Sequence, residues 1–255
     1  PPCDVIYLDP ARRDQNGGKV FRLEDCEPNV VELLPTLTAK SKLLMIKLSP
    51  MLDITQALHS LKGRWDVHVV AVKNEVKEVL LLSNLSRYHS DTTPKVYRED
   101  SEGIVHAINL PASDTFSFSK QEEQDAQCQL FGPSHKQLIE PNNYLYEPNA
   151  AILKAGGYRY IAERFGVHKL DNNTHLFVSD QVVDKFPGRV WQIDQLVRDR
   201  KDLPSTLTQA NILTRNHPLT PDQLKKKLHL RDGGAAYIIG ARVAGKPVLF
   251  LAHRL

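Results

Sequence analysis

The chain has 255 residues, 41% of them hydrophobic and 25% charged, which is the composition of a soluble globular protein with room for two or three domains. Its formal net charge of +3 permits nucleic-acid binding without requiring it, because a basic patch matters more than the total. No run approaches the ~20 apolar residues of a membrane span, no signal peptide is visible, and three scattered cysteines predict free thiols and no metal site, so we expect a cytoplasmic protein.

The first third of the chain alternates between predicted strands and helices. Apolar runs bounded by turn residues predict four strands, at residues 5–8, 43–48, 67–72 and 76–82. Helical spacing predicts two helices between them, at residues 28–37 and 53–61; Asp53 is the N-cap of the second, and Pro35 threatens the last turn of the first. The last two strands are joined too closely to be parallel.

The end of the first strand carries the clearest functional signal. Pro10 lacks a backbone N–H and biases Asp9 towards an extended conformation, which holds the carboxylate at the carboxyl end of the strand. Ligands bind at that edge in open α/β sheets. Arg12 and Arg13 follow, and their planar guanidinium groups can grip phosphate or carboxylate. The simpler alternative for this stretch is a polar surface turn.

Three stretches taken together resemble a known family: residues 9–13, 47–51 and 73–78. They are similar to the bacterial class I S-adenosylmethionine-dependent methyltransferases that carry a THUMP-like domain at the C-terminus. In that superfamily the fourth strand often ends in an Asp-Pro-Pro motif facing the methyl donor and the target, and here Ala11 replaces the second proline. The resemblance covers essentially the whole chain. It implies an α/β fold, with the C-terminal half of a Rossmann-like methyltransferase sheet followed by small α+β modules, ferredoxin-like and THUMP-like.

The resemblance also suggests a domain division. It predicts the C-terminal half of the methyltransferase domain at residues 1–110, a connector at 111–139, a small ferredoxin-like module at 140–180 and a THUMP-like α+β domain at 181–255. The superfamily's glycine-rich turn after the first strand, and the acidic end of its second strand, have no counterpart here. We therefore expect a fragment that lacks three strands and binds the methyl donor weakly or not at all.

Further elements are predicted along the rest of the chain. Apolar runs predict strands at residues 103–110, 175–178, 189–193, 209–214, 236–243 and 247–253. The first of these is expected to pair with residues 95–99, and residues 167–173 are expected to form a turn. Helices are expected to open at Glu147-Pro148, to span residues 158–165, and to follow Thr220 as N-cap with Pro221 in the first turn.

The predicted chemistry is methyl transfer with S-adenosylmethionine as cofactor. We assign catalysis to Asp9, whose carboxylate can accept a hydrogen bond from an exocyclic amine, and to Pro10, which shapes the pocket floor. Substrate binding is assigned to Arg12, Arg13, Lys47, Ser49 and Asn74. No cysteine lies at a strand end, which favours nitrogen methylation over carbon methylation of a pyrimidine.

The closing segment is basic and predicts contact with RNA. The residues assigned to that contact are Arg215, Lys225, Lys226, Lys227, Arg231 and Arg242. The THUMP-like resemblance implies structured RNA, often transfer RNA, and phosphate contacts would give affinity that falls with salt. A helix with a solvated lysine face is the simpler alternative. For the whole chain, two other functions stay open: a non-catalytic RNA-binding protein that uses the sheet as a scaffold, and a methyltransferase acting on protein or a small molecule.

Overall fold

The computed structural model describes residues 2–11, 22–84, 103–111 and 115–255. Two positions predicted to bind substrate, Arg12 and Arg13, and the proposed partner strand at 95–99 lie outside these ranges. The chain divides into two compact units, Pro1–Gln124 with Ala150–Gly157, and Asp125–Asn149 with Tyr158–Leu255. Each unit has its own sheet.

The sheet of the first unit has six strands. In spatial order they are β1 (Cys3–Leu8), β2 (Ser41–Leu48), β4 (Glu75–Asn84), β3 (Asp66–Val72), β5 (Ile104–Leu110) and β6 (Thr115–Ser119). Strands β1, β2, β3 and β5 are parallel, while β4 inserts antiparallel between β2 and β3, and β6 closes one edge. This arrangement confirms the predicted α/β fold and the predicted antiparallel pairing of the two closely joined strands, β3 and β4. The strand predicted at 103–110 was expected to pair with 95–99; among the described residues it forms β5, which pairs with β3 and β6.

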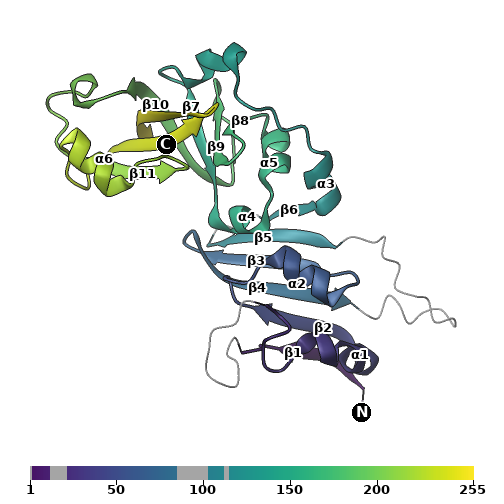
Figure 1. Ribbon diagram of the computed structural model, residues 1–255. Coiled ribbons are helices and arrows are strands. Elements are labelled where there is room, and N and C mark those ends of the chain that lie inside the picture. Colours follow the sequence, from purple (N-terminus) through teal and green to yellow (C-terminus); the bar gives the residue numbers. More distant parts are fainter. Residues whose placement is uncertain (1, 12–21, 85–102, 112–114) are drawn as a thin grey trace. The chain divides into compact units, whose positions relative to one another are not determined.

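Helices α1 (Val30–Lys40) and α2 (Ile54–Leu61) lie beside each other on one face of this sheet (Figure 1). The Asp53 side chain accepts a hydrogen bond from the backbone N–H of Gln56, as predicted for the N-cap of α2. Helix α1 runs through Pro35 to Lys40, longer than predicted. Packing against β2 outweighs the one backbone hydrogen bond that proline removes.

The two faces of the first sheet differ in burial. Leu44, Ile46 and Leu48 alternate along β2 and are buried on the helix-covered side. On β1, Val5 and Tyr7 are 52% and 53% exposed, so the predicted buried strand is buried less than expected. The reason is that β1 is an edge strand that pairs only with β2 among the described strands.

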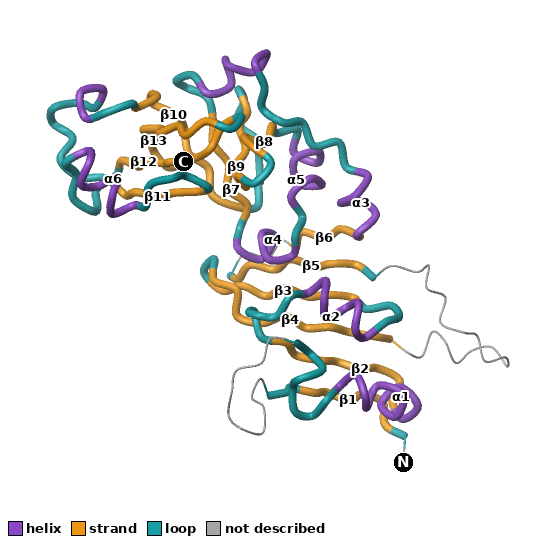
Figure 2. The backbone as a smooth tube through the Cα atoms, viewed as in Figure 1, coloured by secondary structure: helices purple, strands orange, loops and turns teal. Residues whose placement is uncertain are grey.

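The second unit is built on one seven-stranded sheet. Its spatial order is β11 (Asn211–Arg215), β12 (Ala236–Val243), β13 (Lys246–Arg254), β10 (Gly188–Val197), β7 (Tyr144–Pro148), β9 (Thr174–Ser179) and β8 (His168–Asp171). The sheet curls, because β12 also contacts β8 and β9 (Figure 2). The backbone N–H of Ala244 donates to the carbonyl of Leu170 at 3.0 Å where the two ends approach. Trp191 and Phe250 are buried inside the curl.

Helices complete both units. They are α3 (Lys120–Asp125), α4 (Ala150–Ala155), α5 (Tyr158–Phe165) and α6 (Pro221–Leu228), with short 3-10 helices at Pro133–Ile139 and Arg200–Asp202. Thr220 caps α6 as predicted, since its hydroxyl accepts a hydrogen bond from the Gln223 N–H. The predicted helix start at Glu147-Pro148 is wrong, because both residues pair with β10 as part of β7. The predicted turn at 167–173 contains the strand β8, which pairs with β9.

Candidate functional site

The candidate site lies where the parallel strands of the first sheet end. Asp9 follows β1, Ser49 follows β2, and Asn74 lies in the turn after β3, so all three are at the carboxyl edge. Pro10 is buried, and the next residue, Ala11, exchanges two backbone hydrogen bonds with Glu27 at 2.7 and 3.0 Å. These contacts fix the backbone on the far side of Asp9, so its carboxylate stands at a defined place at the strand end.

Asp9 is part of a half-exposed group of three charges. The Lys47 Nζ lies 2.6 Å from Asp9 Oδ2 and 4.0 Å from Glu78 Oε1. The exposed fractions of the side chains are 48% for Asp9, 29% for Lys47 and 47% for Glu78. The hydrogen bond to Asp9 raises the pKa of Lys47, which keeps the ammonium charged. The structure therefore brings Lys47 to Asp9 and adds Glu78, whose proximity depends on the register of β4.

Two residues predicted to bind substrate have structural partners. The Ser49 hydroxyl oxygen accepts a hydrogen bond from the Met51 N–H at 3.3 Å, which shapes the turn after β2. The Asn74 side-chain carbonyl accepts one at 2.7 Å from the N–H of Ala150, the first residue of α4. Their roles in substrate binding stay predictions.

Lys154 also lies at this edge of the sheet, and the sequence analysis did not assign it to the site. Its Nζ donates to the carbonyl oxygen of Leu52 at 2.8 Å, and burial lowers its pKa. Lys154 thereby ties α4 to the loop between β2 and α2. The sequence gives no signal for this contact, which joins residues about a hundred positions apart.

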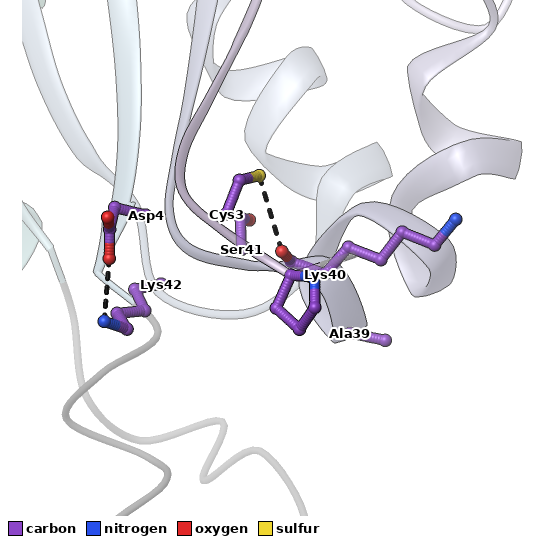
Figure 3. A pocket seen from close by; sticks show the side chains of 7 residues that line it. Cys3, Asp4, Ala39, Lys40, Ser41 and Lys42 are labelled. Carbon is purple, nitrogen blue, oxygen red and sulfur yellow. Dashed lines mark hydrogen bonds and ion pairs between the residues drawn. The ribbon is translucent and has the colours of Figure 1, made fainter.

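A cavity of about 290 Å³ lies at the opposite, amino ends of β1 and β2 (Figure 3). It contains an exposed ion pair, Asp4 with Lys42 at 2.7 Å, and Cys3, whose thiol donates to the Lys40 carbonyl at 3.5 Å. None of the residues assigned to methyl transfer lines it, so it is not part of the candidate site.

In the described part of the chain, no cluster of three or more His, Cys, Asp or Glu side chains has an arrangement suited to a metal ion. No helix there is long and apolar enough to cross a membrane.

The basic residues of the second unit differ in their partners. Lys226, Lys227 and Arg231 are exposed. Lys225 is paired with Asp222 at 3.2 Å and with Asp232 at 2.5 Å. Two arginines are held by the fold: Arg242 donates to the Gly245 carbonyl at 2.8 Å, and Arg215 is paired with Glu147.

Glu147 explains why Arg215 is held so firmly. Its side chain is 2% exposed and is paired with both Arg189 and Arg215. A buried carboxylate needs such partners, because leaving it unpaired costs several kcal/mol, of the order of ~3–5. The exposed positions Lys226, Lys227 and Arg231 are therefore better placed than Arg215 to contact an external anion.

Comparisons with known proteins agree with this architecture. Residues 144–187 match the model of a ferredoxin-like domain, and residues 188–254 match that of a THUMP-like domain. An uncharacterized S-adenosylmethionine-dependent methyltransferase of Mycobacterium tuberculosis, from strains CDC 1551 / Oshkosh and H37Rv, is 22% identical over 94% of this chain. A crystal structure of a candidate methyltransferase from Porphyromonas gingivalis W83 is 34% identical, covers 98% of the chain and has a TM-score of 0.80.

The chain thus has methyltransferase relatives and a THUMP-like domain. Its first unit is an α/β domain with a mixed sheet, its structural neighbour is named a methyltransferase, and ferredoxin-like and THUMP-like domains follow, as predicted. The chain spans 60% of the length of the curated relatives and 59% of the solved chain that it matches.

Proposed function

We propose that this chain is part of an S-adenosylmethionine-dependent methyltransferase that methylates a nitrogen of a base in RNA, with transfer or ribosomal RNA as substrate. The observation that carries the proposal is the half-exposed Asp9 carboxylate, fixed at the carboxyl end of β1 between buried Pro10 and Lys47. Relatives named as S-adenosylmethionine-dependent methyltransferases support the reaction class. The THUMP-like domain supports RNA as the substrate.

Asp9 is placed to orient the target base. Its ion pair with Lys47 uses Oδ2, and Oδ1 can accept a hydrogen bond from an exocyclic amine of the base. Lys47 limits the rotation of the carboxylate, and the backbone bonds of Ala11 limit its displacement. Methyl transfer depends mainly on in-line positioning of donor and acceptor, so this restraint is the protein's main contribution.

The charges at this edge also suit the proposed donor. S-adenosylmethionine bears a sulfonium cation and a carboxylate, and it supplies the methyl group when bound. Asp9 and Glu78 offer negative charge, and Lys47 offers positive charge, on the same edge. Arg12 and Arg13 are proposed to bind a substrate phosphate or the donor carboxylate.

The second unit is proposed to hold the RNA through phosphate contacts. The assigned residues are Arg215, Lys225, Lys226, Lys227, Arg231 and Arg242. The exposed Lys226, Lys227 and Arg231 carry most of this contact, since the other three side chains are paired within the unit. Each phosphate neutralised contributes to affinity that falls as salt rises.

The proposal is tested by transfer of a radiolabelled methyl group from S-adenosylmethionine to total cellular RNA. The longest product of the gene and the 255-residue chain are assayed in parallel. Asp9→Asn removes the charge at the proposed site, and Asp4→Asn is the matched control, because Asp4 forms a similar ion pair with Lys42 at the opposite edge. We expect Asp9→Asn to lower turnover about a hundredfold with RNA affinity kept, and Asp4→Asn to leave turnover unchanged.

Other outcomes select other functions. Full turnover by Asp9→Asn would remove Asp9 from the catalytic machinery. Salt-sensitive RNA binding without any labelled RNA would indicate a non-catalytic RNA-binding protein. Label found in protein or in small molecules would support methyl transfer as the reaction but would show that the substrate is not RNA.

A further inference from the structure

The second unit has a surface hollow of about 430 Å³, and Lys227 is the one lining residue to which RNA contact has been assigned. It lies between the end of β10, the loop before α6, α6 itself and the start of β13. Its apolar floor includes Leu219, Leu224 and Leu249, and its polar members are Arg198, His217 and Lys227. The volume is within the range of sites that hold small molecules, about 300–1,000 Å³.

The imidazole of His217 has a fixed orientation in this hollow. Its Nδ1 lies 3.1 Å from the backbone N and 3.2 Å from the carbonyl O of Leu219, so the loop before α6 holds the ring in place. The ring thus offers a flat face to a ligand.

Gly240 on β12 leaves room for that ring. A Cβ at this position would lie 3.1 Å from His217 Cγ, 3.2 Å from Leu224 Cδ1 and 3.2 Å from Leu249 Cδ2. These distances are shorter than ordinary carbon–carbon contacts of about 3.5–4.0 Å. Because Gly240 has no side chain, the His217 ring can pack against Leu224 and Leu249.

The charges around the hollow favour an anion with a flat apolar part. Lys227 is exposed, and the Arg198 side chain is 88% exposed while its guanidinium is paired with Asp202 at 3.2 Å. A nucleotide combines these properties, since the flat faces of its base stack on apolar and aromatic surfaces and its phosphate is negative. A base inside a duplex is stacked and paired, and cannot reach such a floor.

We propose that this hollow binds one unpaired nucleotide of RNA, with the base against the floor and the His217 ring, and the phosphate at Lys227. The proposal rests on RNA as the substrate of the proposed function and adds how that RNA is recognised. Aromatic and imidazole rings commonly stack on unpaired bases. The second unit therefore selects RNA with an exposed single-stranded end or loop over a blunt duplex.

The test compares the affinity of the 255-residue chain for a single-stranded RNA hexanucleotide and for a blunt RNA duplex. Three variants are measured: His217→Ala, Lys227→Gln and Lys226→Gln. Lys226 is the matched control, because it is exposed on the same helix but does not line the hollow. Lys227→Gln changes an exposed side chain, so we expect this variant to fold like the parent chain.

We expect His217→Ala to weaken binding of the hexanucleotide about tenfold and to leave duplex binding nearly unchanged. Lys227→Gln should weaken binding of the hexanucleotide more than that of the duplex, and should lower the slope of log affinity against log salt by about 0.7 for the single strand. Lys226→Gln should weaken both RNAs by the same factor. The preference of the chain for single-stranded over duplex RNA should therefore be lost in His217→Ala and Lys227→Gln and kept in Lys226→Gln.

Three outcomes would overturn the proposal. If His217→Ala and Lys227→Gln weaken both RNAs equally, the hollow is not a nucleotide site, while RNA binding stands. If neither RNA binds the chain, the hollow and the RNA part of the proposed function both fail. If polyglutamate displaces the hexanucleotide as well as unlabelled RNA does, the hollow accepts any flexible polyanion and does not recognise a base.

Discussion

At the scale of single residues, His175 on β9 is held in an environment that disfavours its charge. Its ring stacks on Tyr158 with centroids 3.8 Å apart and planes 16° apart, and its buried Nδ1 has no hydrogen-bond partner among the described residues. Burial, and then the positive charge of Lys169, lower the pKa of His175 to about 4. The folded state therefore keeps this imidazole neutral at pH values where an unfolded chain begins to protonate it, near 6.5.

This difference predicts that the second unit loses stability in mild acid. Between pH 6.5 and about 4 the unfolded chain binds more protons at His175 than the folded chain, so the contribution is complete above pH 6.5 and declines as the pH falls. His175→Phe keeps the stacked ring and removes the proton. Urea unfolding at about pH 7.5 and about pH 5 should show a smaller loss of stability in the variant than in the parent chain.

His59→Gln is the control for that measurement, because His59 is an exposed histidine on α2. It should lose as much stability on acidification as the parent. Burial and the charge of His135 also lower the pKa of His168, so His175→Phe should reduce the acid sensitivity without abolishing it. Equal losses in His175→Phe and the parent would show that His175 is not the group responsible.

At the scale of elements, Asn74 joins the β3–β4 hairpin to the start of α4. Lys73 and Asn74 both have positive φ, of 50° and 64°, as a tight turn between antiparallel strands requires. The Asn74 side chain then caps α4 from 76 positions away in the sequence. Asparagine suits both demands, because it tolerates the left-handed backbone and carries an acceptor.

Two substitutions separate these contributions. Asn74→Gly keeps the backbone geometry and removes the cap, so the free energy of unfolding should fall by about 1 kcal/mol. Asn74→Ala removes the cap and adds left-handed strain, for a total of about 2–3 kcal/mol. Urea unfolding measures both values. Equal losses would argue against strain in the turn, and a loss of methyl transfer at full stability would instead support the predicted role of Asn74 in substrate binding.

The same scale shows which elements the sequence could predict. Local chemistry was sufficient for the caps Asp53 and Thr220, since each bonds to a residue three positions along the chain. It was insufficient for β6 and β8, which were not predicted, and for β7, whose Glu147-Pro148 resembles a helix start. The pairing of these strands with distant neighbours decides their conformation.

The candidate site, too, was predicted from the sequence only in part. The rule that parallel strands end at one edge is sufficient to predict from the sequence that Asp9 and Lys47 lie together. It could not place Glu78, because that carboxylate reaches Lys47 only through the register of the antiparallel β4. Nor could it show that Glu147 holds Arg215, since 68 positions separate them. Contacts between residues that are far apart in the sequence depend on how the strands pair, and a local sequence pattern does not predict that pairing.

At the scale of the whole molecule, the two matched domains share one sheet. The ferredoxin-like range contributes β7, β8 and β9, and the THUMP-like range contributes β10 to β13. They meet where β7 pairs with β10, from Pro148 opposite Gly188 to Tyr144 opposite Gln192. One buried core inside the curled sheet combines side chains of both ranges, and a second, which includes Leu224 of α6 and Ile238 of β12, lies within the THUMP-like range. The boundary between the two family matches is therefore not a boundary between two cores.

This shared core predicts that both ranges unfold together. Phe250 is fully buried on β13, and Phe250→Ala should destabilise the second unit by about 3–5 kcal/mol through the cavity it leaves. Native-state hydrogen exchange should then become faster by a similar factor in β7 and β9 as in β12 and β13. If β7 and β9 kept their slow exchange while β12 and β13 lost it, the two ranges would be separate folding units. Loss of protection in both would show that a curled sheet, rather than a pair of domains, presents the basic surface proposed to hold RNA.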